Sequence, residues 1–395
     1  MIFMGPVYRP EQEEELIAMS GASISNAAST FQWSIIKGLS NVTDKNVSVI
    51  NALPVGTWPR FFSKLILKSG DWSYNGKPCH EVGCLNLPFI KQFCRYKNTE
   101  RYLKNYCKDE KEIIISTAYM PFLKAAYRLP KDVSVTAIIT DIPEFYDMRR
   151  VSKLRKLLRK INNGFVYKYL SRVDNFVLLT EEMKNPLHVG DRPYVVIEGI
   201  YSSELEKETN EKKREKAILY TGRLNYRYGI ENLLKAFEKI QDADAELWLC
   251  GAGEMENDIK LAAEKDKRIK FFGYQTHAQV LSLQRKVAVL VNPRTNEGEY
   301  TKYSFPSKTM EYMASGAAVV MYKLDGIPNE YDEHLFYAEK NTPDSLKEKL
   351  EEVLSLSECE RAEKGRRARD FILSEKNSDI QSAKIVDMIK KDKAK

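Results

Sequence analysis

The sequence predicts an α/β protein made of two successive series of alternating strands and helices. Short apolar runs typical of buried strands recur along the chain, and glycine turns and helix-like segments separate them. A charge-dense stretch with few apolar residues, 204–216, divides the two series and is typical of a linker. At 395 residues the chain is also long for a single hydrophobic core. We therefore expect two Rossmann-like domains, 1–198 and 199–375, that face a cleft.

Composition narrows the class of protein. The net charge of +7 indicates contact with anions, but does not choose among nucleotide sugars, lipid headgroups and nucleic acid. No apolar run approaches the roughly 18–20 residues of a membrane span. The N-terminus has no basic region or cleavage site, so we expect a cytoplasmic protein. The six cysteines lack CxxC spacing, so we expect reduced thiols and no zinc site.

The most informative stretch is 303–316, which lies between two apolar runs that predict buried strands, 287–291 and 317–320. It predicts a short helix with a defined start and end. Pro306 suits the first helical position, where its missing N–H costs nothing, and Gly316 suits the C-terminal cap.

The start of this helix has the features of an anion site. The amides of Ser307 and Lys308 would be free at the N-terminus, where the helix dipole favours negative charge, and Thr309 continues the polar start. Glu311 lies about one turn further in, where its carboxylate could accept hydrogen bonds from a vicinal diol such as a ribose. The same pattern occurs on many ordinary surface helices, so spacing alone leaves both interpretations open.

The stretch Phe305-Pro-Ser-Lys-Thr-Met-Glu-Tyr-Met-Ala-Ser-Gly316 resembles the donor-site signature of glycosyltransferase family 4, a family of retaining sugar transferases with the GT-B fold. Asn292-Pro-Arg294 resembles the corresponding segment of a subgroup of this family that is common in bacterial polysaccharide gene clusters. In the family's commoner pattern a glutamate stands eight positions before Glu311, and here that position is Tyr303. Of the two acidic positions in the family's pattern, only the second, Glu311, can therefore be assigned with safety.

The resemblance also assigns roles to the two expected domains. It implies that 1–198 is the acceptor-side domain and that 199–375 binds the nucleotide-sugar donor. It further implies that a C-terminal helix, at about 376–395, packs back on the first domain.

A second phosphate-binding unit is expected where a predicted strand leads into Gly222-Arg-Leu-Asn-Tyr-Arg-Tyr-Gly229 and then a helix. Arg223 and Arg227 could grip a diphosphate bidentately, although surface salt bridging is the ordinary role of such arginines. The family's common form is Gly-Arg followed by Lys-Gly, and Tyr228 stands where that lysine would be. The resemblance thus implies that Arg227 or Lys308 supplies the missing charge.

Two weaker donor-side signals follow. The run 246–250 predicts a strand that ends in Gly251-Ala-Gly253, and a lone Gly-x-Gly is weak evidence for phosphate binding. Gly273-Tyr-Gln275 resembles the family segment that flanks the nucleotide base. Tyr274 could stack there or pack in the core.

The acceptor side is expected at the carboxyl ends of the first strands. Gly21 begins a small-residue loop that feeds a helix predicted at 27–38, with Ser25 or Asn26 as its N-cap. A tight capped loop is the ordinary interpretation, whereas the family places a loop here where acceptor and sugar meet. Asp141 follows a predicted parallel strand and is a candidate for contact with the sugar or the acceptor, or for loop capping.

A basic stretch, 149–172, carries nine Lys or Arg and no acid, with apolar residues at helical spacing. Such a helix suits an anionic membrane surface, but a solvated face on a core-packed helix explains the pattern equally well. No nucleic-acid-binding motif accompanies the charge, so we expect no nucleic-acid partner.

Together these features predict a cytoplasmic, retaining glycosyltransferase, which the basic stretch 149–172 could hold at the inner face of the membrane. It would move a hexose-type sugar from a nucleoside diphosphate, expected to be a UDP-sugar, to a glycan or lipid-linked acceptor in surface polysaccharide or glycoconjugate biosynthesis. Arg227, Lys308 and Asp141 are the expected catalytic residues. Because no Asp-x-Asp pair stands at a strand end, we expect neither a metal nor another cofactor. The alternatives are a UDP-sugar epimerase of the same fold and a catalytically silent subunit of a transferase complex.

Overall fold

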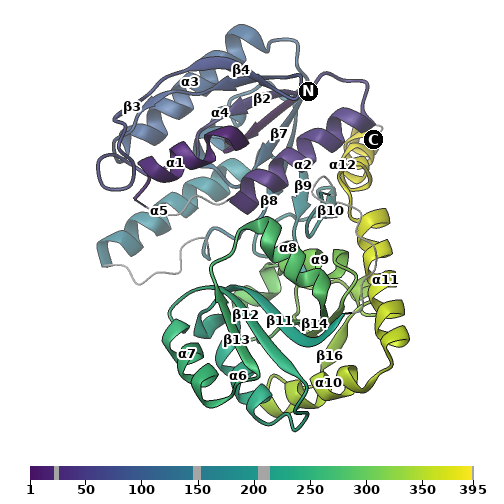
Figure 1. Cartoon of the computed structure of the whole chain (residues 1–395). Helices are drawn as coiled ribbons and strands as arrows, with labels where there is room; N and C mark the ends of the chain where they lie inside the picture. Colours follow the sequence, from purple (N-terminus) through teal and green to yellow (C-terminus); the bar gives the residue numbers. More distant parts are fainter. Residues whose placement is uncertain (22–25, 146–152, 203–213, 394–395) are drawn as a thin grey trace. The chain divides into compact units, whose positions relative to one another are not determined.

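A computed structural model describes residues 1–21, 26–145, 153–202 and 214–393 (Figure 1). The chain divides into two compact units. The first contains Met1–Ile200 together with Ser378–Lys395, and the second is Tyr201–Asn377.

The first unit is built on an eight-stranded sheet with the order β10-β9-β8-β7-β1-β2-β5-β4. All neighbours are parallel except β4 and β5. The central strands are buried runs of Ile, Val and Phe, which suit a parallel sheet covered on both faces. The strands are β1 (Ile2–Gly5), β2 (Ser48–Asn51), β4 (Gly70–Tyr74), β5 (Lys77–Glu81), β7 (Glu112–Ser116), β8 (Ser134–Ile139), β9 (Asn175–Leu178) and β10 (Tyr194–Val196), and a separate antiparallel pair joins β3 (Ile66–Leu67) to β6 (Cys84–Leu85).

Helices cover this sheet, and the last of them comes from the C-terminus of the chain. They are α1 (Glu13–Met19), α2 (Asn26–Val42), α3 (Ile90–Tyr106), α4 (Met120–Ala126), α5 (Lys153–Leu170) and α12 (Ser378–Lys393), with 3₁₀ turns η1 (Pro10–Gln12) and η2 (Glu181–Met183). In one apolar cluster, Ile35 and Leu39 of α2 pack with Ile385 and Ile389 of α12.

The helix predicted at 27–38 is longer in the structure and does not stop at Gly38. It runs on to Val42, because Gly38 lies against α12 rather than at a helix end. A Cβ atom on Gly38 would stand 2.1 Å from the backbone oxygen of Ser378, so the absence of a side chain permits the close approach of the two helices.

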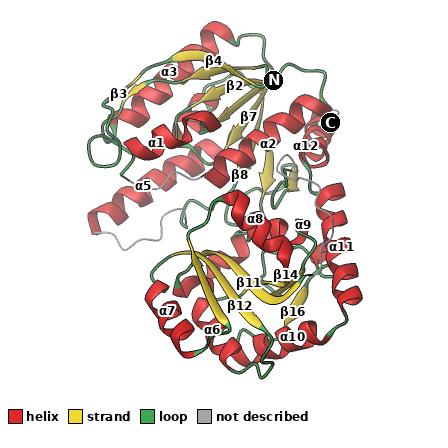
Figure 2. Ribbon diagram, in the orientation of Figure 1, coloured by secondary structure: helices red, strands yellow, loops and turns green. Residues whose placement is uncertain are grey.

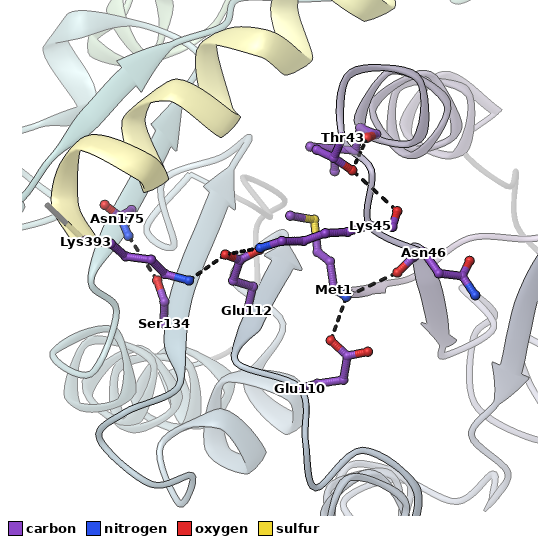
Figure 3. A network of polar contacts seen from close by, with 10 residues as sticks. Met1, Thr43, Lys45, Asn46, Glu110, Glu112, Ser134, Asn175 and Lys393 are labelled. Carbon is purple, nitrogen blue, oxygen red and sulfur yellow. Dashed lines mark hydrogen bonds and ion pairs between the residues drawn. The ribbon is translucent and has the colours of Figure 1, made fainter.

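Charged groups also join α12 to the sheet (Figure 3). Glu112, at the start of β7, has an almost buried side chain and pairs with both Lys45 and Lys393, each at 2.5 Å. The two cations lower the pKa of the Glu112 carboxyl, although burial opposes them. Nearby, the amino group of Met1 pairs with Glu110 at 2.6 Å. Met1 and the last helix are thus both held at the amino ends of the central strands β1 and β7.

The second unit is a doubly wound parallel sheet with the order β13-β12-β11-β14-β15-β16 (Figure 2). Its strands are β11 (Glu215–Arg223), β12 (Glu246–Ala252), β13 (Ile269–Gly273), β14 (Val287–Asn292), β15 (Ala318–Tyr322) and β16 (Phe336–Ala338). Its helices are α6 (Ile230–Glu238), α7 (Glu256–Lys265), α8 (His277–Lys286), α9 (Lys308–Ala314), α10 (Pro343–Ser355) and α11 (Glu358–Glu375), with 3₁₀ turns η4 (Tyr226–Tyr228), η5 (Glu299–Tyr303) and η6 (Asn329–Tyr331).

Alternate residues of β11 enter two different cores, one on each face of this sheet. Ile218 lies in a core formed with α6, α7 and α10, and Leu219 lies in a core formed with α8, α9 and α11. Helices α8 and α9 therefore cover the same face and can bring their side chains together.

The charged stretch predicted as a linker overlaps this strand. Residues 203–213 lie outside the described part of the chain, but Glu215 already belongs to β11 and pairs with Val287. The strand also runs past Thr221 to Arg223, because it pairs with β12 as far as Ala252. Gly222 and Arg223 are therefore strand residues and not part of a turn.

Candidate functional site

Two glycines lie at the carboxyl ends of β11 and β12: Gly222 leaves room for the start of α9, and Gly251 leaves room for the backbone of Gly222. Gly222 and Gly251 have φ angles of 148° and 142°, which residues with a side chain rarely adopt. A Cβ atom on Gly251 would stand 1.7 Å from the oxygen of Gly222, and a Cβ atom on Gly222 would stand 2.8 Å from Cε of Lys308. The Lys308 side chain therefore lies over bare backbone. Gly253 follows β12 and lies against Leu224 in the same way.

Helix α9 begins at Lys308, with Ser307 as its N-cap residue. The prediction that Pro306 is the first helical residue is therefore wrong by two positions. Thr309 N donates to Pro306 O at 2.8 Å, so Pro306 instead supplies the carbonyl of the turn that leads into the helix. Ser307 is exposed, whereas Thr309 is fully buried with its hydroxyl against the sulfur of Met321. The Thr309 side chain thus belongs to the core and not to the surface that Ser307 shares.

Lys308 and Glu311 stand one turn apart on α9, and both are half-buried. Removal from water lowers the pKa of the Lys308 ammonium, and the neighbouring carboxylate of Glu311 opposes part of that shift. An incompletely compensated cation beside bare backbone is suited to an anionic ligand.

Two residues of α8 face the Glu311 carboxylate, and the sequence analysis missed both. Gln284 Nε2 donates to Glu311 Oε1 at 2.5 Å, and His277 Nε2 lies 3.9 Å from Glu311 Oε2. The signal that could have found them is their spacing of two helical turns, which places them on one face of α8. That spacing does not reveal which helix they face.

The buried Tyr312 hydroxyl fixes α9 to β11 through the backbone of Thr221. Tyr312, next to Glu311 in the chain, is fully buried. Thr221 N donates to the Tyr312 hydroxyl at 2.9 Å, and that hydroxyl donates to Thr221 O at 3.1 Å. Burial raises the pKa of Tyr312, so it remains a neutral hydrogen-bonding group.

The two predicted arginines and Tyr274 are all exposed. Arg227 lies in η4, donates from Nε to the Tyr300 hydroxyl at 3.0 Å, and places its guanidinium 4.1 Å from that ring. Arg223 ends β11, and its backbone oxygen accepts from Tyr220. Tyr274 is 81% exposed after β13, which contradicts the alternative that it packs in the core.

The predicted residues of the first unit lie at separate places in it. Gly21 donates its N–H to Phe61 O at 3.2 Å. Ser25 lies outside the described residues, and Asn26 is the first residue of α2 rather than its N-cap. Asp141 follows β8 and accepts from the Thr140 hydroxyl at 3.2 Å, and partial desolvation raises the pKa of its carboxyl.

The first unit also contains a polar cluster that the sequence did not reveal. Glu81, at the end of β5, accepts from Asn51 Nδ2 at 2.5 Å and from Leu53 N at 2.9 Å, and burial raises its pKa to about 7. Lys91 and Arg95 are buried on α3 and donate to backbone oxygens of the loop after β2. Burial lowers the pKa of Lys91 to about 7. These contacts hold the loop that follows β2.

Among the residues that the structure describes, we find no helix long and apolar enough to cross a bilayer.

Comparison with known proteins identifies the kind of enzyme. Residues 202–370 match the family described as glycosyl transferases group 1. The chain is 26% identical over 311 residues to an uncharacterised glycosyltransferase of Methanocaldococcus jannaschii, a match that covers 76% of this chain and 82% of that protein.

Solved structures confirm the predicted fold. An E. coli trehalose-6-phosphate structure bound with UDP-2-fluoro glucose aligns with a TM-score of 0.66 at 11% identity, covering 98% of each chain. WaaG, a glycosyltransferase involved in lipopolysaccharide biosynthesis, aligns with a TM-score of 0.59 at 14% identity, covering 97% of this chain and 98% of that one. The parallel sheets, the matched segment and these likenesses together show that the chain is a glycosyltransferase with the GT-B fold.

Proposed function

We propose that the chain is a retaining transferase of glycosyltransferase family 4 that uses a nucleoside-diphosphate sugar, with UDP-sugar as the expected donor. The acceptor is a glycan or a lipid-linked glycan of surface polysaccharide or glycoconjugate biosynthesis, and the transferred group is a hexose-type sugar. The observation that carries this proposal is the arrangement of Lys308 over Gly222 with Glu311 one turn further along α9. The aligned E. coli structure, which holds UDP-2-fluoro glucose, and the lipopolysaccharide enzyme WaaG support it.

In this proposal Lys308 binds the diphosphate and stabilises the charge that grows on it as the sugar leaves. A diphosphate beside the ammonium would replace the solvation that burial has removed, so binding would raise the lowered pKa of Lys308. Gly222 and Gly251 present backbone without side chains, so phosphate oxygens can approach closely. The exposed Ser307 adds a donor at the helix start, and Arg223 and Arg227 are further candidate cations.

Glu311 is the proposed ribose ligand, and the exposed Tyr274 is the proposed base-stacking residue. An ionised carboxylate accepts hydrogen bonds and so can receive both hydroxyls of a vicinal diol. Since cationic side chains can neutralise the leaving diphosphate, we propose that transfer needs neither a metal nor another cofactor. Asp141, at the carboxyl end of β8, remains a proposed sugar contact, and Gly21 and Asn26 remain proposed acceptor-side residues.

We also propose that the protein is cytoplasmic and binds the inner face of an anionic membrane through 149–172. On α5, Leu157, Leu158, Ile161 and Phe165 are each at least 40% exposed. They lie among exposed lysines, so the alternative of a core-packed apolar face does not hold for these four positions. Exposed apolar side chains combined with Lys and Arg suit an anionic bilayer surface. Residues 146–152 lie outside the described part of the chain.

The direct test is transfer with defined donors. The full chain is screened by thermal shift against UDP-, GDP- and ADP-sugars, and the stabilising donor is assayed with glycan and lipid-linked acceptors. We expect a UDP-sugar to stabilise the protein and a product that keeps the donor's anomeric configuration by NMR. An inverted product would refute retention, and conversion of the free UDP-sugar to its epimer would favour the epimerase alternative. Binding without either reaction would favour a silent subunit.

A further inference from the structure

We propose that Gln284 is a positioning residue that fixes the Glu311 carboxylate for the donor's ribose, and that it thereby sets the preference of the site for ribonucleotides. This inference rests on the proposed function, in which Glu311 holds the ribose diol. It adds a residue on a different helix and a measurable specificity that depends on it.

The two oxygens of Glu311 face two side chains of α8. Gln284 Nε2 donates to Oε1 at 2.5 Å, and His277 Nε2 lies 3.9 Å from Oε2. The Glu311 side chain is 26% exposed, and that of His277 is 51% exposed, whereas Gln284 is fully buried. The contact with Gln284 is thus the interior one, protected from competing water.

The chemistry of the carboxylate decides how the amide is oriented. An ionised carboxylate only accepts hydrogen bonds, so the Gln284 nitrogen, and not its oxygen, must face Glu311. The same nitrogen lies 3.4 Å from Thr221 Oγ1. In this orientation Gln284 Oε1 is buried and has no hydrogen-bond partner among the described residues.

A buried acceptor without a partner destabilises a fold, whereas a hydrocarbon side chain of similar size would not. Fold stability alone therefore does not explain an amide at this position. The contact with Glu311 does explain it, because it directs one carboxylate oxygen.

The backbone beneath Glu311 is already fixed by other residues. Tyr312 is fully buried and exchanges hydrogen bonds with the backbone of Thr221, which holds α9 on β11. These backbone contacts do not fix the torsions of the Glu311 side chain, which a single strong donor such as Gln284 can restrict. A carboxylate held in place before the ligand arrives loses less conformational entropy when it binds two ribose hydroxyls.

The test compares nucleotides with and without the ribose diol. Full-length protein is titrated calorimetrically with UDP, GDP, ADP and their 2′,3′-dideoxy analogues. For wild type we expect a preference of about 30-fold for the ribonucleotide, since a site built to bind hydroxyls rejects a ligand without them. Gln284→Leu should reduce that preference to about 3-fold, mainly by weakening ribonucleotide binding, with the dideoxy affinity changed by no more than about twofold. Thermal unfolding of this variant should occur at the wild-type temperature or above.

Matched variants separate positioning from structure. Gln241→Leu makes the same chemical change at an exposed position of the same unit and should leave the preference unchanged. Glu311→Ala should abolish the preference, and adding Gln284→Leu to it should change the preference no further, because the two residues act in series. Should Gln284→Leu fold poorly, Gln284→Met provides the same readout with a more adaptable side chain.

The outcomes are distinct. A wild-type preference in both Gln284 variants, or an equal loss of affinity for both kinds of nucleotide, would overturn the positioning role while leaving the proposed function standing. An unchanged preference in Glu311→Ala would overturn the ribose assignment and this inference together. If none of the nucleotides binds the wild-type protein, the ribose assignment and this inference are likewise both overturned.

Discussion

The side chain of Lys308 lies directly over Gly222, so that a Cβ atom there would stand 2.8 Å from its Cε and 3.1 Å from its Nζ. The contact joins the start of α9 to the end of β11. It depends in turn on Gly251, whose missing side chain leaves room for the backbone of Gly222.

Replacing these glycines should have graded effects. Gly222→Ala should destabilise the protein by about 1–3 kcal/mol, because φ becomes strained while the flexible Lys308 can move. Gly251→Ala should cost more, about 3 kcal/mol or above, since its Cβ atom would meet rigid backbone. Unfolding in denaturant measures the free energy of unfolding of both variants and of the wild type. Gly164→Ala is the control: Gly164 is an exposed residue of α5 whose added Cβ atom would meet nothing within 4 Å, and a gain of about 0.5–1 kcal/mol is expected. Equal losses at 222 and 251 would contradict this account.

Lys308→Met should weaken UDP binding by about 10- to 100-fold at pH 7, because a charge-assisted contact is lost. The pKa of Lys308 is lowered, so its ammonium is lost at lower pH than that of an ordinary lysine. Wild-type affinity for UDP should therefore fall as pH rises through that lowered pKa, and the difference in UDP affinity between wild type and variant should shrink. Titration calorimetry of both proteins from pH 7 to 9.5 measures these affinities. A difference that stays constant over that range would argue against Lys308 as the anion ligand.

The same substitution should not destabilise the free protein at pH 7. With a folded pKa below the unfolded one, the unfolded chain binds more protons, so wild-type stability rises with pH between the two values. Lys308→Met removes this desolvated charge and should unfold at or above the wild-type temperature. Its stability should also lose that part of the pH dependence.

Glu112→Gln should loosen the attachment of α12 to the amino end of β7 in the first sheet. We expect a loss of about 1–2 kcal/mol at pH 7, less than for a fully buried pair because Lys45 and Lys393 are about half exposed. The folded pKa of Glu112 is lowered, so its stabilisation is present above the unfolded pKa and is lost as pH falls through the folded value. Urea unfolding of wild type and variant should therefore converge in acid. Persistence of the full difference at pH 3 would show that the ion pairs are not its source.

The exposed apolar residues of α5 give a test of membrane binding. Leu157→Asn combined with Ile161→Asn should reduce co-sedimentation with phosphatidylglycerol vesicles by about tenfold or more, since two side chains no longer enter the bilayer. Leu261→Asn removes an equally exposed leucine from α7 of the second unit and serves as the control. Unchanged binding of the double variant, or equal loss in the control, would contradict the assignment to α5.

The sequence alone determined the α/β class and the short helix within the stretch from 305 to 316, because both depend only on residues that are contiguous in the chain. Buried parallel strands need unbroken apolar runs, and a short helix between two of them carries its polar start and its glycine end in one segment. The same local logic placed Lys308 and Glu311 one turn apart. It failed at Gly38 and Pro306, where a close helix contact and a turn carbonyl replaced the predicted helix end and helix start.

Only the tertiary structure decided which side chains meet. Gln284 reaches Glu311, Tyr312 reaches Thr221 and Lys393 reaches Glu112 across long stretches of chain. No local pattern encodes these contacts, because each depends on strand order and on which face of a sheet a helix covers.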